Sequence, residues 1–169
     1  YIIFFLSFSF LRVLPKLLQF NNTAFIYFTS GSTGVSKGIK ISHKNIISDV
    51  FAQVTHLHNF SLKKKNKQLV FGDYYDTAFS IFFDIFFPAI YLKAAISPGL
   101  KKEEILLPID HCKKNQVNIL VAVPSTIQRI KIYNDKKKID HQFNSIIMTG
   151  EPFYLNVLKY LFDYFKSKK

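Results

Sequence analysis

Short apolar runs alternate with longer segments of helical length along most of this chain. Runs of this length, rich in β-branched and aromatic residues, are typical of buried strands. Strands are predicted at 24–28 (AFIYF), 68–71 (QLVF), 93–97 (KAAIS), 117–123 (VNILVAV) and 144–150 (NSIIMTG). Because strands that alternate with helices build parallel sheets, the pattern predicts an α/β fold, with a mainly parallel sheet flanked by helices.

The segments between these strands have apolar residues at helical spacing or are apolar throughout. Helices are predicted from Ser42 through the following SHKNIISDVFAQVTHLH run, over 79–92, over 103–115 with an interruption near Pro108, from Pro124 onward, and over 154–165. Ser42 is a favourable N-cap residue, and Pro124 suits the first turn of a helix. Pro88 is expected to bend or end the apolar helix in which it lies.

Residues 1–23 are interpreted as an apolar lead-in to one partial domain over 24–169. The first eleven residues, YIIFFLSFSFL, are apolar. A helix needs about 20 residues to span a bilayer, so no membrane span is expected here. The segment also lacks the basic start and the cleavage site of a signal peptide. A buried strand is the preferred interpretation.

Composition narrows the classes of partner. The 169 residues include 23 basic and 11 acidic side chains, for a net charge of +12. Such a balance is compatible with nucleic acid, anionic lipid or a phosphorylated ligand. Arginine occurs only at Arg12 and Arg129, whereas base readout depends strongly on arginine, and the lysines are spread over several connections. No nucleic acid partner is therefore expected.

The single cysteine, Cys112, indicates a reducing, cytoplasmic location, because it cannot form a disulfide framework or a zinc site alone. We interpret it as a small buried hydrophobe. The five histidines show no metal-ligand spacing, so no protein-held metal site is expected.

The segment FTSGSTGVSKG (28–38) interrupts the apolar pattern directly after a predicted strand. A glycine-rich loop can direct several backbone N–H groups at one point, and such a nest binds phosphate. The candidate phosphate-binding residues are Thr29, Ser30, Gly31, Ser32, Thr33, Gly34 and Lys37. An ordinary Gly/Ser surface loop is the alternative. The segment is not a P-loop, because Lys37 is followed by glycine rather than by Ser or Thr.

This stretch, continued as IKISHKNI, resembles the signature loop of the adenylate-forming (AMP-binding) enzymes. The family includes acyl-CoA synthetases, the adenylation domains of nonribosomal peptide synthesis and D-alanine-activating ligases. Its pattern is roughly [YF]TSGSTGxPKG, then a Val/Ile-rich strand and a helix start of the type S/T-H-x-N/G. The chain departs from the pattern at Ser36, where the family commonly has proline.

Three further segments resemble family elements in the same order. YYDTAFSIFFDIFFPAIYLKAAI (74–96) is similar to an aromatic–Asp segment, VNILVAVPSTIQRI (117–130) to a V-P-S/T strand–helix element, and SIIMTGEPF (145–153) to a GGEP strand end. The resemblance implies that Asp76, or alternatively Asp84, pairs with a substrate ammonium. It also implies that Gly150 and Glu151 lie by the adenine and acyl pocket, although Glu151 could equally cap the last helix. His43 is either near the nucleotide loop or a helix-start residue without chemistry.

The resemblance implies ATP-dependent activation of a carboxylic acid, with an amino acid favoured, as an acyl-adenylate. ATP and Mg²⁺ would be the cofactors, and a carrier protein or coenzyme A would be the acyl acceptor. The chain lacks the Y-G-x-T-E string and the lid lysine of the family. We therefore expect a fragment of the N-terminal half that has little activity alone, and we assign no catalytic residue. The rival hypotheses are a non-catalytic nucleotide- or anion-binding module, and a basic protein that binds RNA or membrane surfaces.

Overall fold

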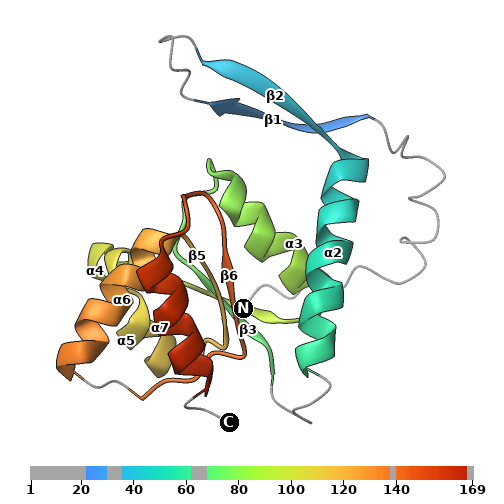
Figure 1. Ribbon diagram of the computed structural model, residues 1–169. Coiled ribbons are helices and arrows are strands. Elements are labelled where there is room, and N and C mark those ends of the chain that lie inside the picture. The colour runs from blue at the N-terminus through green and yellow to red at the C-terminus, as the bar shows by residue number, and fades with distance from the viewer. Residues whose placement is uncertain (1–21, 30–35, 62–67, 138–139, 167–169) are drawn as a thin grey trace. The chain divides into compact units, whose positions relative to one another are not determined.

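The computed structural model describes residues 22–29, 36–61, 68–137 and 140–166 (Figure 1). The chain divides into two compact units at Phe51, within helix α2 (His43–Ser61). Among the described residues, no helix is long and apolar enough to cross a membrane.

The first unit contains a two-stranded antiparallel sheet. Strand β1 (Thr23–Thr29) pairs with β2 (Lys37–Ser42), so the strand predicted at 24–28 is confirmed. Its predicted burial is wrong, because Phe28 is 72% exposed and Ile26 is 53% exposed. Among the described residues β1 pairs only with β2, so this two-stranded sheet is not part of the parallel sheet of the second unit.

Helix α2 begins where the sequence predicts, and its first turn is closed by side chains. The Ser42 hydroxyl accepts a hydrogen bond from the Asn45 backbone N–H at 3.2 Å. In return, the Asn45 side-chain oxygen accepts the Ser42 backbone N–H at 3.0 Å. This reciprocal pair satisfies two N–H groups that a helix start leaves without partners.

The second unit is built on a four-stranded parallel sheet. Its strands are β3 (Val70–Asp73), β4 (Ala95–Pro98), β5 (Ile119–Ala122) and β6 (Ser145–Met148), in the order β4-β3-β5-β6. All three pairings are parallel. The predicted α/β class, with a parallel sheet flanked by helices, is confirmed.

The connecting segments are helical. They contain the short 3-10 turn η1 (Ser80–Phe82), α3 (Phe83–Tyr91), α4 (Lys102–Leu106), α5 (Ile109–Lys114), α6 (Pro124–Lys137) and α7 (Leu155–Lys166). The interruption predicted near Pro108 separates α4 from α5. Pro88 does not end its helix, because α3 continues through it to Tyr91.

Helices cover both faces of the sheet, and the side chains of β5 show how (Figure 1). Ile119 and Val121 pack into one apolar cluster with residues of α3 and the end of α2. Leu120 and Ala122 point to the other face and join residues of α5, α6 and α7. The alternation follows from the two-residue period of a strand, and burial on both faces explains why the run is continuously apolar.

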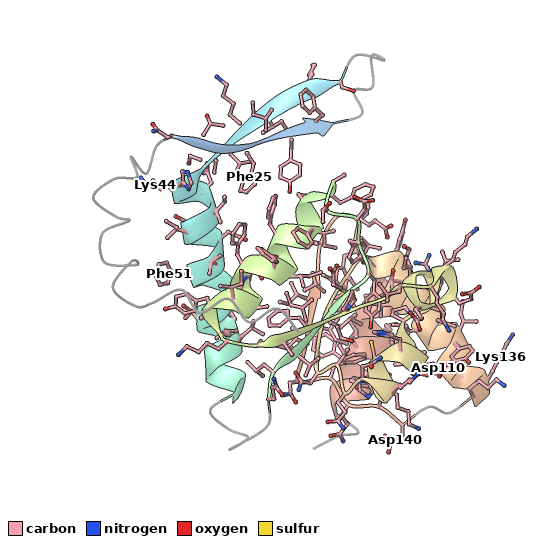
Figure 2. The ribbon with its side chains drawn as sticks, turned by 180° about the vertical axis from the view of Figure 1, so that it is seen from behind. Phe25, Lys44, Phe51, Asp110, Lys136 and Asp140 are labelled. Atoms are coloured by element: carbon pink, nitrogen blue, oxygen red, sulfur yellow. The ribbon has the colours of Figure 1, made fainter. Side chains whose placement is uncertain are left out.

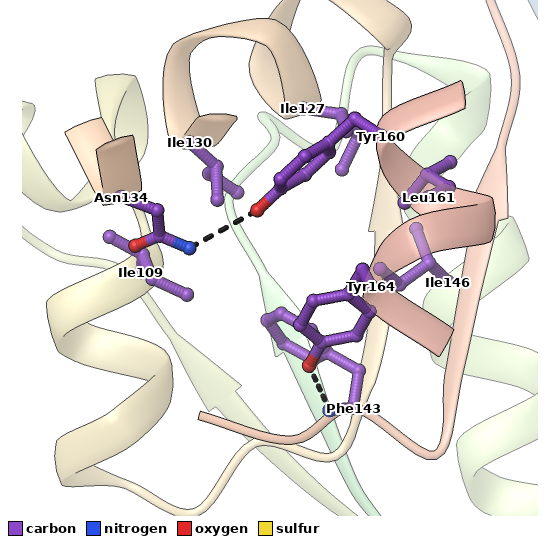
Figure 3. Close-up of a pocket in the computed structure, with 9 residues that line it drawn as sticks. All are labelled: Ile109, Ile127, Ile130, Asn134, Phe143, Ile146, Tyr160, Leu161 and Tyr164. Atoms are coloured by element: carbon purple, nitrogen blue, oxygen red, sulfur yellow. Dashed lines mark hydrogen bonds between the residues drawn. The ribbon is translucent and has the colours of Figure 1, made fainter. Parts of the chain in front are cut away.

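Hydrogen bonds also connect the helices α5, α6 and α7, which pack on the same face of the sheet. The Tyr133 hydroxyl on α6 donates a hydrogen bond to the Asp110 carboxylate on α5 at 2.8 Å; Asp110 is labelled in Figure 2. Figure 3 shows a small cavity between α5, α6 and α7, where the Asn134 side-chain N–H donates to the Tyr160 hydroxyl at 3.2 Å. The cavity volume is about 10 Å³, so it holds at most one water molecule and is part of the core.

Candidate functional site

The strand order places a crevice between β3 and β5. The chain leaves β3 toward β4, then returns past β3 to β5 and continues outward to β6. Neighbouring connections therefore diverge between β3 and β5, which is where open α/β sheets bind ligands, outside the carboxyl ends of the strands.

The structure contains a groove of about 480 Å³ at this point. Most of its lining comes from the segments that follow the carboxyl ends of β3, β4 and β5. The lining residues are Asp73, Tyr74, Tyr75, Asp76, Phe79, Pro98, Gly99, Ile105, Leu106, Val123, Thr126 and Arg129. A mainly apolar and aromatic wall with a few polar groups is the usual composition of a small-molecule site.

The end of β3 and the segment after it contribute two carboxylates to the groove. Asp73 is partly buried, and this burial raises the pKa of its carboxyl group, while the hydrogen bond that it accepts from the Tyr75 backbone N–H at 3.3 Å opposes the shift. Asp76 is exposed and accepts the Ala78 backbone N–H at 2.8 Å, which closes a local turn. The structure thus places the predicted residue Asp76 in the groove.

Asp84, the alternative to Asp76, lies elsewhere. It is in the first turn of α3 and accepts a hydrogen bond from the Gln53 side-chain amide at 3.0 Å. It does not line the groove. A partly buried carboxylate in an apolar run needs such a partner, and Gln53 provides it.

Tyr74 forms part of the groove wall, and its ring and hydroxyl are both fixed by contacts with neighbouring residues. A Cβ atom added at Gly72 or at Gly99 would lie 2.6 Å from its ring, so both positions leave room only for glycine. The Tyr74 hydroxyl lies 2.8 Å from His111 Nδ1 and 3.0 Å from Cys112 Sγ, both on α5. Burial raises the pKa of the Tyr74 phenol and raises the pKa of the Cys112 thiol to about 12, so both groups stay protonated near neutral pH.

A second hydrogen-bonded group joins the segment after β3 to the start of α6. The Tyr75 hydroxyl accepts the Val123 backbone N–H at 3.0 Å and also bonds the Thr126 hydroxyl. Burial raises the pKa of Tyr75, and the nearby positive charge of Arg129 opposes that shift. Thr126 in turn accepts a hydrogen bond from the Arg129 guanidinium at 2.8 Å.

Glu151 caps a helix, but not the last one. Both of its carboxylate oxygens accept hydrogen bonds from Ser125: the backbone N–H at 2.9 Å and the hydroxyl at 2.9 Å. Ser125 is the second residue of α6, whereas the last helix begins at Leu155, so the alternative that Glu151 caps the last helix is wrong. Gly150 has a positive φ of 84°, which favours glycine and turns the chain between β6 and this contact.

The candidate phosphate-binding loop is only partly visible. Ser30, Gly31, Ser32, Thr33 and Gly34 lie outside the described residues. Thr29 ends β1 and Lys37 begins β2, and the two are paired in the antiparallel register. Lys37 is exposed.

His43 is the first residue of α2, and its backbone N–H donates to the Asn22 carbonyl oxygen at 3.1 Å. This contact belongs to the helix start. Nothing in it uses the imidazole.

Four polar residues of the groove were not predicted as site residues: Asp73, Tyr75, Thr126 and Arg129. A signal for them was present, because each lies within a few residues of the end of a predicted strand, and ligand sites gather at such ends in parallel sheets. Arg129 carries a second signal as one of only two arginines among 23 basic residues.

Over the described ranges, no three His, Cys, Asp or Glu side chains are grouped as metal ligands. Asp73 and Asp76 line the groove without a third acidic neighbour in its wall. Among the described residues, the groove therefore offers at most two carboxylates to a metal ion.

The sequence matches the family described as AMP-binding enzyme over residues 11–168. The chain belongs to this family. The D-alanine–D-alanyl carrier protein ligase of Lactococcus lactis is 25% identical over 140 residues, covering 80% of this chain and 27% of the ligase. Bacitracin synthase 2 of Bacillus licheniformis is 27% identical over 133 residues, covering 75% of this chain and 5% of the synthase.

Solved structures of adenylate-forming proteins share the fold. The McyG A-PCP protein, solved with phenylalanyl-adenylate, has a TM-score of 0.68 and 20% identity, over 88% of this chain and 24% of the other. A fatty acyl-adenylate ligase from L. pneumophila, solved with acyl adenylate and pyrophosphate, has a TM-score of 0.66 and 18% identity, and the match covers 88% of this chain and 26% of the ligase. At these identities the likeness shows the fold alone.

The chain spans 1% to 27% of the length of the curated relatives it matches. The substrates and products of those whole proteins therefore do not by themselves establish the substrates and products of this chain.

Proposed function

We propose that this AMP-binding family member takes part in the ATP-dependent activation of a carboxylic acid, and that the acid is an amino acid. The carboxylate would attack the α-phosphorus of ATP, forming an acyl-adenylate and releasing pyrophosphate. The observation that carries the proposal is the groove at the carboxyl ends of β3 and β5, which contains Asp76.

The two carboxylates favour an amino acid over a fatty acid. Asp73 and Asp76 line the groove, and a substrate ammonium would offset their negative charge. A fatty acid has no positive group to place there, so its binding would leave the partly buried Asp73 without a counter-charge. The relatives named above include a D-alanine–D-alanyl carrier protein ligase, whose name contains an amino acid as its substrate.

In this proposal the loop 29–37 binds the phosphates. Backbone N–H groups, the hydroxyls of Thr29, Ser30, Ser32 and Thr33, and the Lys37 ammonium would hold the leaving pyrophosphate. Mg²⁺ would accompany the triphosphate as its counter-ion. Gly150 and Glu151 would act by fixing the start of α6 beside the groove.

After activation, the acyl group would pass to a carrier protein or to coenzyme A. We propose a cytoplasmic location for this reaction, on the grounds that the single cysteine is buried and protonated rather than part of a disulfide.

The test is the binding of adenylate analogues, because binding does not depend on turnover by the chain alone. Isothermal titration would compare an alanyl-sulfamoyl-adenosine, a fatty acyl-sulfamoyl-adenosine and AMP. We expect the aminoacyl analogue to bind most tightly and Asp76→Asn to weaken it about ten-fold, the effect of losing one charged hydrogen bond. Asp135→Asn is the matched control, since Asp135 pairs with Lys131 on α6 and does not line the groove.

Equal binding of the aminoacyl analogue and AMP would refute the assignment to acid activation. Tighter binding of the fatty acyl analogue would refute the choice of an amino acid while keeping the reaction class.

A further inference from the structure

We infer that Arg129 is an anion-binding residue of the groove and that it selects a substrate with a second carboxylate, that is, an acidic amino acid. The inference rests on the function proposed above. It names the substrate class of the same groove.

The Arg129 guanidinium is fixed in place by two hydrogen bonds. Its Nε donates to the Leu106 carbonyl oxygen at 2.9 Å, and one terminal nitrogen donates to the Thr126 hydroxyl at 2.8 Å. Leu106 is the last residue of α4, and Thr126 is buried in the first turn of α6. The planar group is therefore held between two helices, with little further entropy to lose when a ligand binds.

The same group keeps donors for a ligand. A guanidinium has five N–H donors, and these contacts use two, so three remain. Within the described ranges no carboxylate forms an ion pair with Arg129, and the ion pair found there joins Lys131 to Asp135. A fixed, un-neutralised guanidinium in a groove wall is suited to a carboxylate, which it can bind through two parallel hydrogen bonds.

The groove as a whole has the charges for such a substrate. Asp73 ends β3, Asp76 follows it in the next segment, and Arg129 is on α6. An amino acid brings one ammonium, which the carboxylates can accept. The proposed function assigns the β- and γ-phosphates to the loop 29–37 and directs the α-carboxylate at the α-phosphorus. We therefore assign the anion at Arg129 to a side-chain carboxylate, that of glutamate or aspartate.

A structural role alone makes a different prediction. Arg129 also satisfies a carbonyl oxygen at the end of α4, so its removal could loosen the groove for every ligand. Only an anion-binding role changes the ratio between two ligands that differ in one charge. The ratio is therefore the quantity to measure.

The experiment titrates the full chain with glutamyl-sulfamoyl-adenosine and with its neutral isostere, glutaminyl-sulfamoyl-adenosine. Both probes have the same blocked α-carboxyl group and differ only at the end of the side chain. We expect the glutamyl probe to bind about two- to five-fold more tightly, in keeping with a charged pair at an exposed arginine. Arg129→Gln should abolish this preference, and Arg129→Lys should restore part of it because a charge remains.

Lys131→Gln is the matched control: it removes one positive charge two residues farther along α6, outside the groove wall, and should leave the ratio unchanged. Thermal unfolding of each variant shows whether it folds. If the two probes bind the wild-type chain equally, or if Arg129→Gln keeps the preference, the inference is overturned while the proposed function stands. If neither probe binds more tightly than AMP but the alanyl probe does, the inference is overturned and the proposed function stands. If none of the three aminoacyl probes binds more tightly than AMP, the proposed function fails, and the inference fails with it.

Discussion

Replacing Glu151 should destabilise the fold because its carboxylate caps the start of helix α6, although Glu151 itself lies outside that helix. Helix α6 begins with Val123 in the N-cap position, and valine has no side-chain acceptor for the first N–H groups. Pro124 has no N–H, and the Thr126 N–H reaches the Val123 carbonyl oxygen at 3.0 Å. The Ser125 N–H therefore needs an acceptor from outside the helix. The Glu151 carboxylate, in the loop after β6, accepts this hydrogen bond at 2.9 Å.

The magnitude follows from these contacts. Loss of an N-cap acceptor costs about 1 kcal/mol. Loss of the negative charge from the positive end of the helix adds about 0.3–1 kcal/mol, and part of the second hydrogen bond is recovered by water. We therefore expect Glu151→Ala to lower the free energy of unfolding by about 1–2 kcal/mol, or the melting temperature by roughly 2–8 °C for a chain of this size.

Urea denaturation followed by circular dichroism measures the effect, with Glu151→Gln and Ser125→Ala as companion variants. Glutamine keeps an acceptor oxygen for the Ser125 N–H and loses only the charge, so Glu151→Gln should cost less than Glu151→Ala. Combining Ser125→Ala with Glu151→Ala should give a coupling free energy of about 0.5–1 kcal/mol, since the two side chains share a hydrogen bond. An unchanged midpoint for Glu151→Ala would show that α6 does not depend on this cap, and the reasoning would fail.

Three other outcomes follow from the residues around the groove. Gly99→Ala should lower the free energy of unfolding by about 1–3 kcal/mol in urea denaturation, because its methyl group would lie 2.6 Å from the Tyr74 ring; an unaffected variant would contradict the packing. Tyr74→Phe should cost about 1–2 kcal/mol by the same assay, because His111 and Cys112 lose a buried partner; a neutral result would show that the hydroxyl contributes nothing. Burial raises the pKa of the Cys112 thiol to about 12 in the folded protein, so the stability that this shift contributes is present below about pH 8.5 and is lost as the pH rises toward 12. The free energy of unfolding, measured at increasing pH, should therefore fall less steeply in Cys112→Ala than in the wild type. Equal slopes for the two proteins would contradict this prediction.

Much of the second unit could be predicted because its local signals agree with its tertiary structure. Strand β5 (ILVA, 119–122) is apolar at every position, and burial on both faces of a parallel strand requires that pattern. The break at Pro108 and the helix start at Ser42 follow from properties of single residues. The burial of AFIYF could not be predicted, because the same apolar run fits a central strand and a strand of an exposed antiparallel pair.

The site was predictable only where a motif identified a residue. Asp76 could be named from its aromatic neighbour and its resemblance to a family segment. Asp73 lies outside the segments that resemble the family, and the element matched at 117–130 implies no role for Thr126 or Arg129. These residues meet because the strand order places the ends of β3 and β5 side by side. Strand order depends on the handedness and direction of the crossovers, and the hydrophobic pattern does not contain that information.

The role of Glu151 shows how an incomplete local signal can still point to a distant partner. The sequence V-P-S at the start of α6 supplies a proline at the first helical position and no side chain at the cap. A buried sheet leads directly into this helix, so the free N–H groups at its start need an acceptor from elsewhere in the chain. In a parallel sheet the segments that follow two neighbouring strands, here β5 and β6, begin at the same edge of the sheet. An acidic residue after β6 therefore lies near the start of α6, where the helix dipole favours a negative charge. Pairing a cap-deficient helix start with an acidic residue at the end of the next strand would therefore have predicted the contact between Ser125 and Glu151 without coordinates, and it would have distinguished this cap from one on the last helix.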